Sequence, residues 1–201
     1  MKTNHLTHLF LTTVVAAALA GCASAPSHFY TLTSTAAGDG TPPASYAVVV
    51  GPVSIPGSVD RPEFTIQAGT NRVEIDEFNR WAAPLSDNIA RAVAGDLAVL
   101  LGTPQVAMAG LANFDPAYRV TIDIQRFESL RSPGMGDSSV LVEAMWVIRR
   151  TAGGTAHPGH TVASEPAPGG SFEALAAAHS RALAKVSSDI AAAIRADADG
   201  K

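Results

Sequence analysis

The sequence predicts an α+β fold, in which a mostly antiparallel sheet carries two long helices packed on one face. Alternating apolar and polar residues mark several strands, most clearly over residues 118–125. Apolar residues at helical spacing mark two long segments, residues 85–101 and 171–197. The chain order of strands, helix, long strands and helix is typical of α+β proteins.

The first part of the chain contains four predicted strands. Residues 28–32 form a brief strand, and residues 46–55 form a longer, valine-rich one. Pro52 interrupts the longer strand and lacks a backbone N–H, which predicts a bend, a bulge or an edge position there. Residues 63–67 and 72–75 alternate on either side of a glycine-containing turn and therefore predict a hairpin.

The first helix is predicted to begin near Pro84 and to end at Gly102, because proline suits a first helical turn and glycine suits a helix end. Its apolar stripe consists of Leu85, Ile89, Val93, Leu97 and Leu100. Residues 105–108 form a candidate short strand after it.

Three more strands and the second helix complete the expected fold. Residues 118–125 alternate cleanly, which predicts a half-buried strand. Residues 140–150 are mostly apolar on both faces, so we expect a central strand covered on both sides, followed by a weaker strand over residues 160–165. The second helix is expected to run from Ser171, as its N-cap, to about Asp197.

Cys22, the single cysteine of the chain, closes the tetrapeptide Leu19-Ala20-Gly21-Cys22 after an apolar run. That run, residues 9–20, is too short to span a bilayer and is typical of a signal peptide. The tetrapeptide resembles a bacterial lipobox, which implies a diacylglyceryl group on the Cys22 sulfur and an acyl group on its amine after cleavage. A thiolate is the nucleophile that such a thioether requires. A buried structural cysteine is the alternative interpretation.

These features divide the chain into three parts. We expect a lipoprotein signal peptide over residues 1–21, a lipidated tether with a short strand and loop over residues 22–45, and a single periplasmic α+β domain over residues 46–201. The strand of residues 29–32 is expected to join the sheet of that domain. Ala23 follows the cysteine in place of aspartate, which resembles lipoproteins exported to the outer membrane. Two or more acyl chains hold a protein firmly on a membrane.

The composition excludes several function classes. The formal net charge is −4 and the sequence has no basic run, which argues against nucleic-acid binding. His157 and His160 share a loop, but no third metal ligand lies near them in the sequence. We therefore expect no catalytic residue, no metal site, and no cofactor apart from the acyl groups on Cys22.

One segment combines charge, amide, guanidinium and indole groups ahead of the first helix. It contains the candidate partner-binding residues Phe78, Asn79, Arg80 and Trp81, of which arginine and tryptophan are frequent interface anchors. The alternative interpretation is structural, because Phe78 and Trp81 would then fix the helix onto the sheet. If the segment binds a partner, Trp81→Ala or Arg80→Ala should weaken binding without unfolding the protein.

The chain resembles the PqiC (YmbA) family of ABC-type transport auxiliary lipoproteins. Besides the lipobox, the resemblance rests on Phe29-Tyr30-Thr31-Leu32, Val50-Gly51-Pro52-Val53, Asp60-Arg61-Pro62 and Glu77-Phe78-Asn79-Arg80-Trp81-Ala82-Ala83-Pro84-Leu85. It covers most of the mature chain, and the C-terminal half supports it by pattern alone.

This resemblance implies a non-catalytic outer-membrane lipoprotein that faces the periplasm. Its partner would be a PqiB-like MCE-domain protein of a system that moves lipid between the two membranes. It would dock that partner against the outer membrane, with a homo-oligomeric ring as one form of the assembly. A lipid-binding carrier with an acyl-chain pocket is the alternative function, and a hydrolase lacks the necessary triad.

Overall fold

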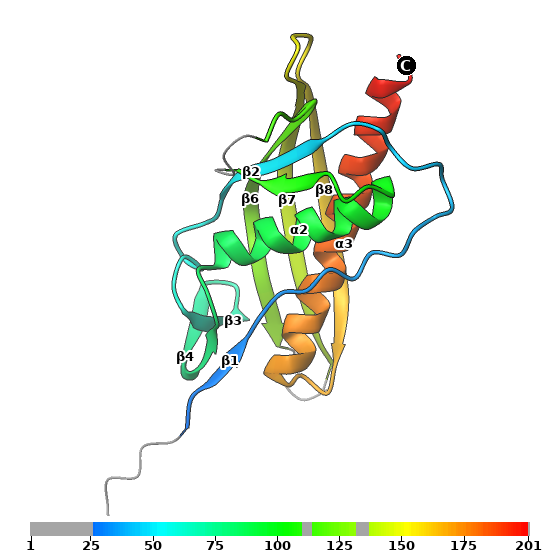
Figure 1. Cartoon of the computed structure of the whole chain (residues 1–201). Coiled ribbons are helices and arrows are strands. Elements are labelled where there is room, and N and C mark those ends of the chain that lie inside the picture. Colours follow the sequence, from blue (N-terminus) through cyan, green and yellow to red (C-terminus); the bar gives the residue numbers. More distant parts are fainter. Residues whose placement is uncertain (1–25, 110–113, 132–136, 201) are drawn as a thin grey trace, which may run out of the picture.

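The computed structural model describes residues 26–109, 114–131 and 137–200 (Figure 1). Cys22 and the predicted signal peptide lie outside the described residues. The elements in chain order are β1 (His28–Tyr30), β2 (Val48–Ser54), β3 (Glu63–Gly69), β4 (Arg72–Trp81), α2 (Leu85–Leu101), β5 (Val106–Met108), β6 (Tyr118–Arg131), β7 (Asp137–Arg150), β8 (His157–Pro168) and α3 (Phe172–Ala198).

The described strands form one mixed sheet that branches at β6. One edge of β6 pairs antiparallel with β7, which pairs antiparallel with β8. The other edge pairs in parallel with β2 over residues 118–123 and with β3 at Leu130. Strand β5 joins β2 in parallel, and the hairpin β3–β4 carries β1 in parallel on its outer edge.

The expectation of a mostly antiparallel sheet is therefore wrong. The hairpins β3–β4, β6–β7 and β7–β8 are antiparallel, as short connections require. The parallel pairs join strands that lie far apart in the sequence, such as β1 with β4 and β2 with β6. Alternation of side chains indicates which face of a strand is buried, but it carries no information on strand direction.

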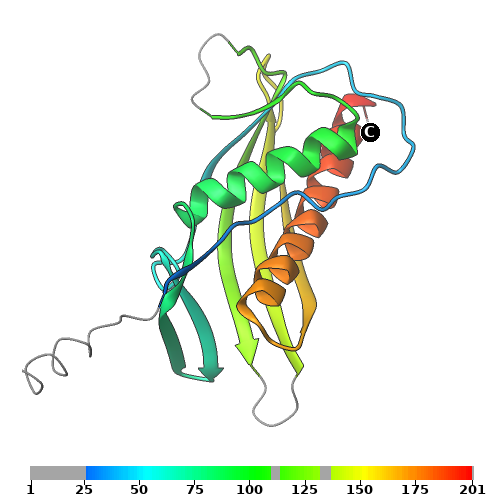
Figure 2. The same cartoon turned by 60° about the horizontal axis from the view of Figure 1, so that its bottom comes forward.

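Both helices contact the sheet and each other. Helix α3 packs on β7 and β8, and helix α2 packs on β2 and β5 (Figure 2). Whether both cover a single face of the sheet stays a prediction. Neither of these helices combines the length and hydropathy of a membrane-spanning segment.

The helix ends follow the signals in their sequences. The Ser171 hydroxyl accepts a hydrogen bond of 3.1 Å from the Ala174 N–H, which caps the start of α3. Gly102 ends α2 in the left-handed conformation, with φ 63°. Pro84 lies just before α2 rather than in its first turn, so the helix begins at Leu85.

Several strands differ from their predicted form. Strands β6 and β8 extend beyond the predicted residues 118–125 and 160–165, to Arg131 and over His157–Pro168. Strand β4 continues to Trp81, although the sequence suggested a strand only as far as Ile75. Strand β7 is central, but the face opposite the core is not covered, since Met145 and the neighbouring Val162 of β8 are exposed. The apolar residues on that face therefore do not indicate burial, because folded proteins expose much apolar surface.

An extended segment after β1 crosses α2 and α3 (Figure 1). The fully buried Asp96 of α2 binds this segment: one carboxylate oxygen accepts hydrogen bonds of 2.8 to 3.0 Å from the Ser34 hydroxyl and from the Thr35 and Ala36 N–H groups. Its other oxygen accepts from the Ser187 hydroxyl of α3 at 3.1 Å. One carboxylate thus joins the N-terminal segment to both helices.

We predict that Asp96→Ala lowers the free energy of unfolding by roughly 3 kcal/mol, because it removes the buried acceptor of four hydrogen bonds that join the N-terminal segment to both helices. Urea unfolding measures this change. The matched variant Asp123→Ala removes an exposed carboxylate and should change the free energy by less than about 1 kcal/mol. Equal losses in the two variants would contradict the role of Asp96.

Candidate functional site

The four residues predicted to bind a partner differ in how far their side chains are exposed. All four lie at the end of β4. Phe78 is 41% exposed, and Asn79 and Arg80 are partly buried, but Trp81 is only 5% exposed. The indole therefore belongs to the protein interior, as the structural interpretation of the segment required.

Trp81 lies in a cluster of aromatic side chains, here called the aromatic cluster: Tyr30, Phe64, Trp81, Phe127 and Phe172. Trp81 stacks on Phe64 at 4.3 Å between ring centroids and meets the edge of Phe127 at 6.1 Å. Phe64 also contacts Tyr30 at 5.6 Å and Phe172 at 5.3 Å. A Trp81→Ala variant would open a large cavity here. It therefore cannot separate partner binding from folding, and partner binding by the four residues stays a prediction.

A bulge in β4 sets the direction of Phe78. The pairing with β3 shifts between Asp76 and Arg80. One Asp76 carboxylate oxygen accepts hydrogen bonds from the Phe78 N–H, the Asn79 N–H and the Asn79 side-chain amide, at 2.8 to 3.0 Å. Partial burial acts to raise the pKa of Asp76, but these hydrogen bonds outweigh it and keep the pKa below its ordinary value. Asp76 is therefore an ionised structural group that holds the bulge.

A hollow with a volume of about 440 Å³ lies beside Trp81 and opens to solvent. It is here called the Trp81 hollow, and its lining consists of Asp60, Arg61, Pro62, Trp81, Ala82, Ala83, Pro84 and Leu85. The two lining segments precede β3 and follow β4. Because β3 and β4 form a hairpin, the residues just outside its two ends meet, and Glu63 pairs with Arg80. The hairpin predicted from the sequence therefore contained the information needed to predict this hollow.

Backbone hydrogen bonds fix the walls of the Trp81 hollow. The Trp81 N–H donates to the Pro62 carbonyl at 2.7 Å, and the Ala82 N–H donates to the Tyr30 carbonyl at 2.8 Å. The buried amide of Asn88 donates to the Ala83 carbonyl at 3.1 Å. These bonds hold the hollow in one shape.

The Trp81 hollow has a mainly apolar lining that contains one arginine. The side-chain Nε atom of this residue, Arg61, is buried and makes no hydrogen bond within the described residues. A buried donor without an acceptor is costly.

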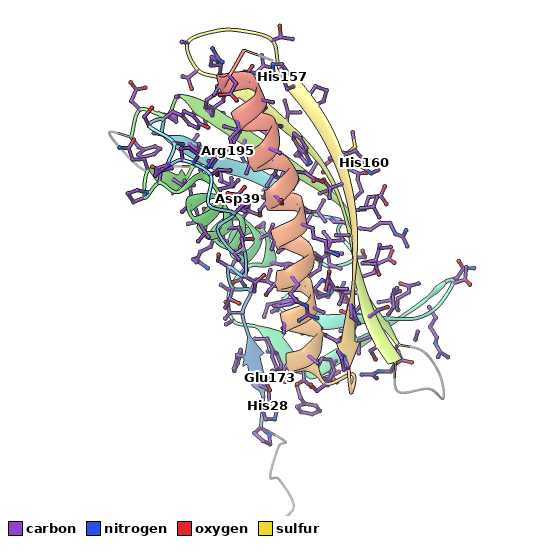
Figure 3. All side chains as sticks on the ribbon, turned by 90° about the vertical axis from the view of Figure 1, so that its right-hand side faces the viewer. His28, Asp39, His157, His160, Glu173 and Arg195 are labelled. Atoms are coloured by element: carbon purple, nitrogen blue, oxygen red, sulfur yellow. The ribbon has the colours of Figure 1, made fainter. Side chains whose placement is uncertain are left out.

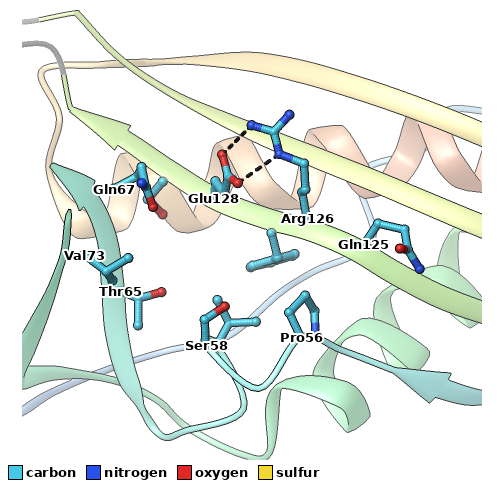
Figure 4. Close-up of a pocket in the computed structure, with 11 residues that line it drawn as sticks. Pro56, Ser58, Thr65, Gln67, Val73, Gln125, Arg126 and Glu128 are labelled. Carbon is cyan, nitrogen blue, oxygen red and sulfur yellow. Dashed lines mark hydrogen bonds and ion pairs between the residues drawn. The ribbon is translucent and has the colours of Figure 1, made fainter. Parts of the chain in front are cut away.

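A second, smaller cavity of about 70 Å³ lies between β3 and β6 (Figure 4). Thr65, Gln67 and Ser129 line it, and an ion pair between Arg126 and Glu128, at 2.8 Å, lies beside it. Ser129 also contacts α3, since its hydroxyl and the His179 Nε2 atom are 2.9 Å apart. The sequence did not indicate this contact, because the two residues lie on β6 and α3.

The Ser129–His179 pair does not have the properties of a catalytic pair. Both side chains are buried, His179 stacks on Phe127 at 3.9 Å, and its Nδ1 atom makes no hydrogen bond within the described residues. Burial lowers the pKa of His179 to about 3. A general base needs a pKa near the working pH and a third group that orients it. His179 is therefore a neutral core residue, as its place on the apolar stripe of α3 suggests.

His157 and His160 do not come together at a metal site. Both lie on strand β8 rather than in a loop, at separate points (Figure 3). His157 Nε2 contacts the Asp197 carboxylate at 2.9 Å, whereas His160 Nε2 contacts Glu143 at 2.9 Å. Within residues 26–109, 114–131 and 137–200, no group of three or more histidine, cysteine, aspartate or glutamate side chains could hold a metal ion.

The low pKa of His179 predicts a pH dependence of stability. Below pH 6.5 the unfolded chain binds a proton at His179, and the folded protein binds it only near pH 3. The free energy of unfolding should therefore fall by about 1.4 kcal/mol per pH unit from about pH 6 to pH 4 through this residue alone. The double variant His179→Leu with Ser129→Ala should lack that contribution, as urea unfolding at several pH values can measure.

The single variant Ser129→Ala is the matched control, since it keeps the buried imidazole and should keep the native slope. Identical slopes in the native protein and the double variant would show that His179 is protonated equally in both states.

The fold is similar to two solved structures. The crystal structure of protein XCC0632 from Xanthomonas campestris aligns with a TM-score of 0.68 and 19% identity, over 82% of this chain and 93% of that chain. A crystal structure of an uncharacterized protein aligns with a TM-score of 0.63 and 16% identity, over 85% and 99% of the two chains. At these identities the similarity concerns the fold alone. No curated protein matches the sequence.

The family comparison agrees with the resemblance found in the sequence. The family model described as the ABC-type transport auxiliary lipoprotein component matches residues 30–191, from β1 to the last turns of α3. This range includes the Trp81 hollow and the aromatic cluster. The chain therefore belongs to the PqiC/YmbA-type family of ABC-type transport auxiliary lipoproteins.

Proposed function

We propose that this protein is anchored to the outer membrane through acyl groups on Cys22, faces the periplasm, and docks an MCE-domain protein that carries lipid between the membranes. The family supports the roles of lipoprotein and transport component, and it is not a known enzyme family. The outer membrane, the MCE partner and a homo-oligomeric ring are the specific parts of the proposal.

The observation that carries the docking role is the composition of the Trp81 hollow. Its two walls come from Asp60-Arg61-Pro62 and from Trp81–Leu85, which are two of the segments on which the family resemblance rests. Both belong to one surface with a mainly apolar lining that includes Arg61. Interfaces are often centred on such a pocket, into which the partner inserts an anchor residue.

The hollow also lies close to the proposed anchor. Cys22 precedes His28, the first residue of β1, by six positions. The last residue of β1, Tyr30, accepts the hydrogen bond from the Ala82 N–H in the wall of the hollow. A partner bound there would be held near the membrane that contains the acyl chains.

No observation favours the lipid-carrier alternative. Ligand sites typically measure about 300–1,000 Å³ and enclose most of the ligand. Among the described residues, the cavity between β3 and β6 measures about 70 Å³, and the larger hollows, of about 280 to 440 Å³, are open to solvent.

The anchor proposal predicts a modified and membrane-bound mature chain. Intact-mass analysis should find a chain that begins at Cys22 and carries diacylglyceryl and N-acyl groups, in the outer-membrane fraction. Ala23→Asp should keep the added mass but move the protein to the inner-membrane fraction. An unmodified thiol at Cys22, or a protein released into the soluble fraction, would contradict the proposal.

The docking proposal predicts that Ala82→Tyr weakens binding to the MCE partner by about tenfold or more, because the larger side chain fills the pocket that a partner's anchor would enter. Ala82 is exposed, so the free energy of unfolding should change by less than about 0.5 kcal/mol. Calorimetric titration of the two purified proteins measures the binding.

The matched control is Ala192→Tyr, which adds the same side chain at an exposed position of α3. It should bind the partner normally. If Ala82→Tyr and Ala192→Tyr both bind as the native protein does, the Trp81 hollow is not the interface.

A further inference from the structure

Exposed large apolar side chains gather on two neighbouring strands. Those of β1 and β4 in the described residues are Phe29, Val73, Ile75 and Phe78, with exposed fractions of 63%, 45%, 49% and 41%. The others are dispersed over α2, β5, β7 and β8. Dispersed apolar residues are normal on a protein surface, whereas a group on one surface marks an interaction site.

The pairing of the strands places three of these residues on the same face. Phe29 and Glu63 are both paired with Arg80, and directly paired residues point to the same face. Along β3, every second residue after Glu63 shares that face, and these residues pair with Ile75 and Val73. The aromatic cluster lies on the opposite face, since Tyr30, Phe64 and Trp81 alternate with these residues.

Phe78 lies beside this face. Its backbone N–H is held by Asp76 in the bulge of β4, two residues from Arg80. Arg80 itself donates from Nε to the Glu77 carbonyl at 3.0 Å and lies 3.3 Å from the Glu63 carboxylate. The ring of Phe78 is exposed. The surface formed by Phe29, Val73, Ile75 and Phe78 is here called the β1–β4 face.

The tether limits how far the β1–β4 face can move from the anchor. Cys22 and His28 are six positions apart, and a fully extended chain spans at most about 3.6 Å per residue, or about 22 Å in total. His28 and Glu173 lie at one end of the molecule, whereas His157 and Arg195 lie toward the other end (Figure 3). The end that carries β1 is therefore the end held near the membrane.

We propose that the β1–β4 face rests on the membrane that holds the acyl chains of Cys22, with Phe29 and Phe78 among the lipid headgroups. This inference depends on the proposed anchoring. Aromatic and aliphatic side chains bind such interfaces by burying apolar area. The short tether favours lipid over a protein partner, because it keeps this face within reach of lipid continuously.

Charge contributes little to this contact. The two arginines of β4 are paired, Arg80 with Glu63 and Arg72 with Glu74. Glu77 and Asp76 add negative charge nearby. Attraction to anionic lipid requires unpaired basic residues. The contact is therefore apolar and should be insensitive to salt.

Spin labels at single cysteines test this contact in the full lipoprotein. Because Cys22 is the only native cysteine and the proposed anchor blocks its sulfur as a diacylglyceryl thioether, an introduced cysteine is the only free thiol. The test variants are Phe29→Cys and Phe78→Cys. Their controls, of matched exposure but on β8 and α2, are Val162→Cys, whose native residue is 56% exposed, and Val99→Cys, whose native residue is 42% exposed.

Each labelled protein is placed in vesicles of phosphatidylethanolamine and phosphatidylglycerol. Electron paramagnetic resonance then compares collisions of the nitroxide with oxygen, which concentrates in lipid, and with a water-soluble nickel chelate. The ratio of oxygen to nickel collisions should be several-fold higher at positions 29 and 78 than at positions 162 and 99, at low and at high salt.

Equal ratios at the four positions would overturn the inference while leaving the anchor intact. Spin–spin broadening between labels at position 29 on two molecules would show instead that a second copy covers this face. Labelling of the unsubstituted chain would reveal a free Cys22 thiol and would contradict both the proposed anchoring and the inference that depends on it.

Discussion

The stacking of Trp81 on Phe64 is the contact on which the functional end of this protein depends. It joins the two strands of the β3–β4 hairpin, and Tyr30 packs on the same Phe64 ring from β1. With Tyr30 held in the interior, the alternation of β1 turns Phe29 outward. With Trp81 held in the interior, the backbone beside it forms the wall of the Trp81 hollow. The same contact thus positions the proposed partner site and the proposed lipid-contacting surface.

The N-terminal segment is bound to the domain along its length, so that a force on the anchor would reach the whole fold. Asp96 fixes residues 34–36 to both helices. Gly95 permits this close approach, since a Cβ atom there would lie 2.9 Å from the Cβ of Ser34. Buried polar contacts of this kind specify one arrangement among many that would bury similar apolar area. An accessory protein that holds a partner at a membrane requires such a rigid connection.

Local patterns predicted much of the fold. The two helices, the β3–β4 hairpin and the strands β6 and β7 follow from side-chain period and from glycine, proline and serine at element ends. The parallel pairs of the sheet could not be predicted, because they depend on where distant strands meet. The burial of Trp81 and the Ser129–His179 contact could not be predicted for the same reason, since each depends on residues more than fifteen positions away in the sequence. Arg61 was part of a recognised motif, but only the closed hairpin places it beside Trp81.

The central claim is that the end of the sheet carrying β1 and the Trp81 hollow is the end that meets the transport partner. Photo-crosslinking in cells tests this most directly, with a photoreactive residue at the exposed Pro62 in the wall of the hollow and at the exposed Ala177 on α3. The account predicts a crosslink from position 62 to an MCE-domain envelope protein and none from position 177. A crosslink to that protein from position 177 alone would contradict it.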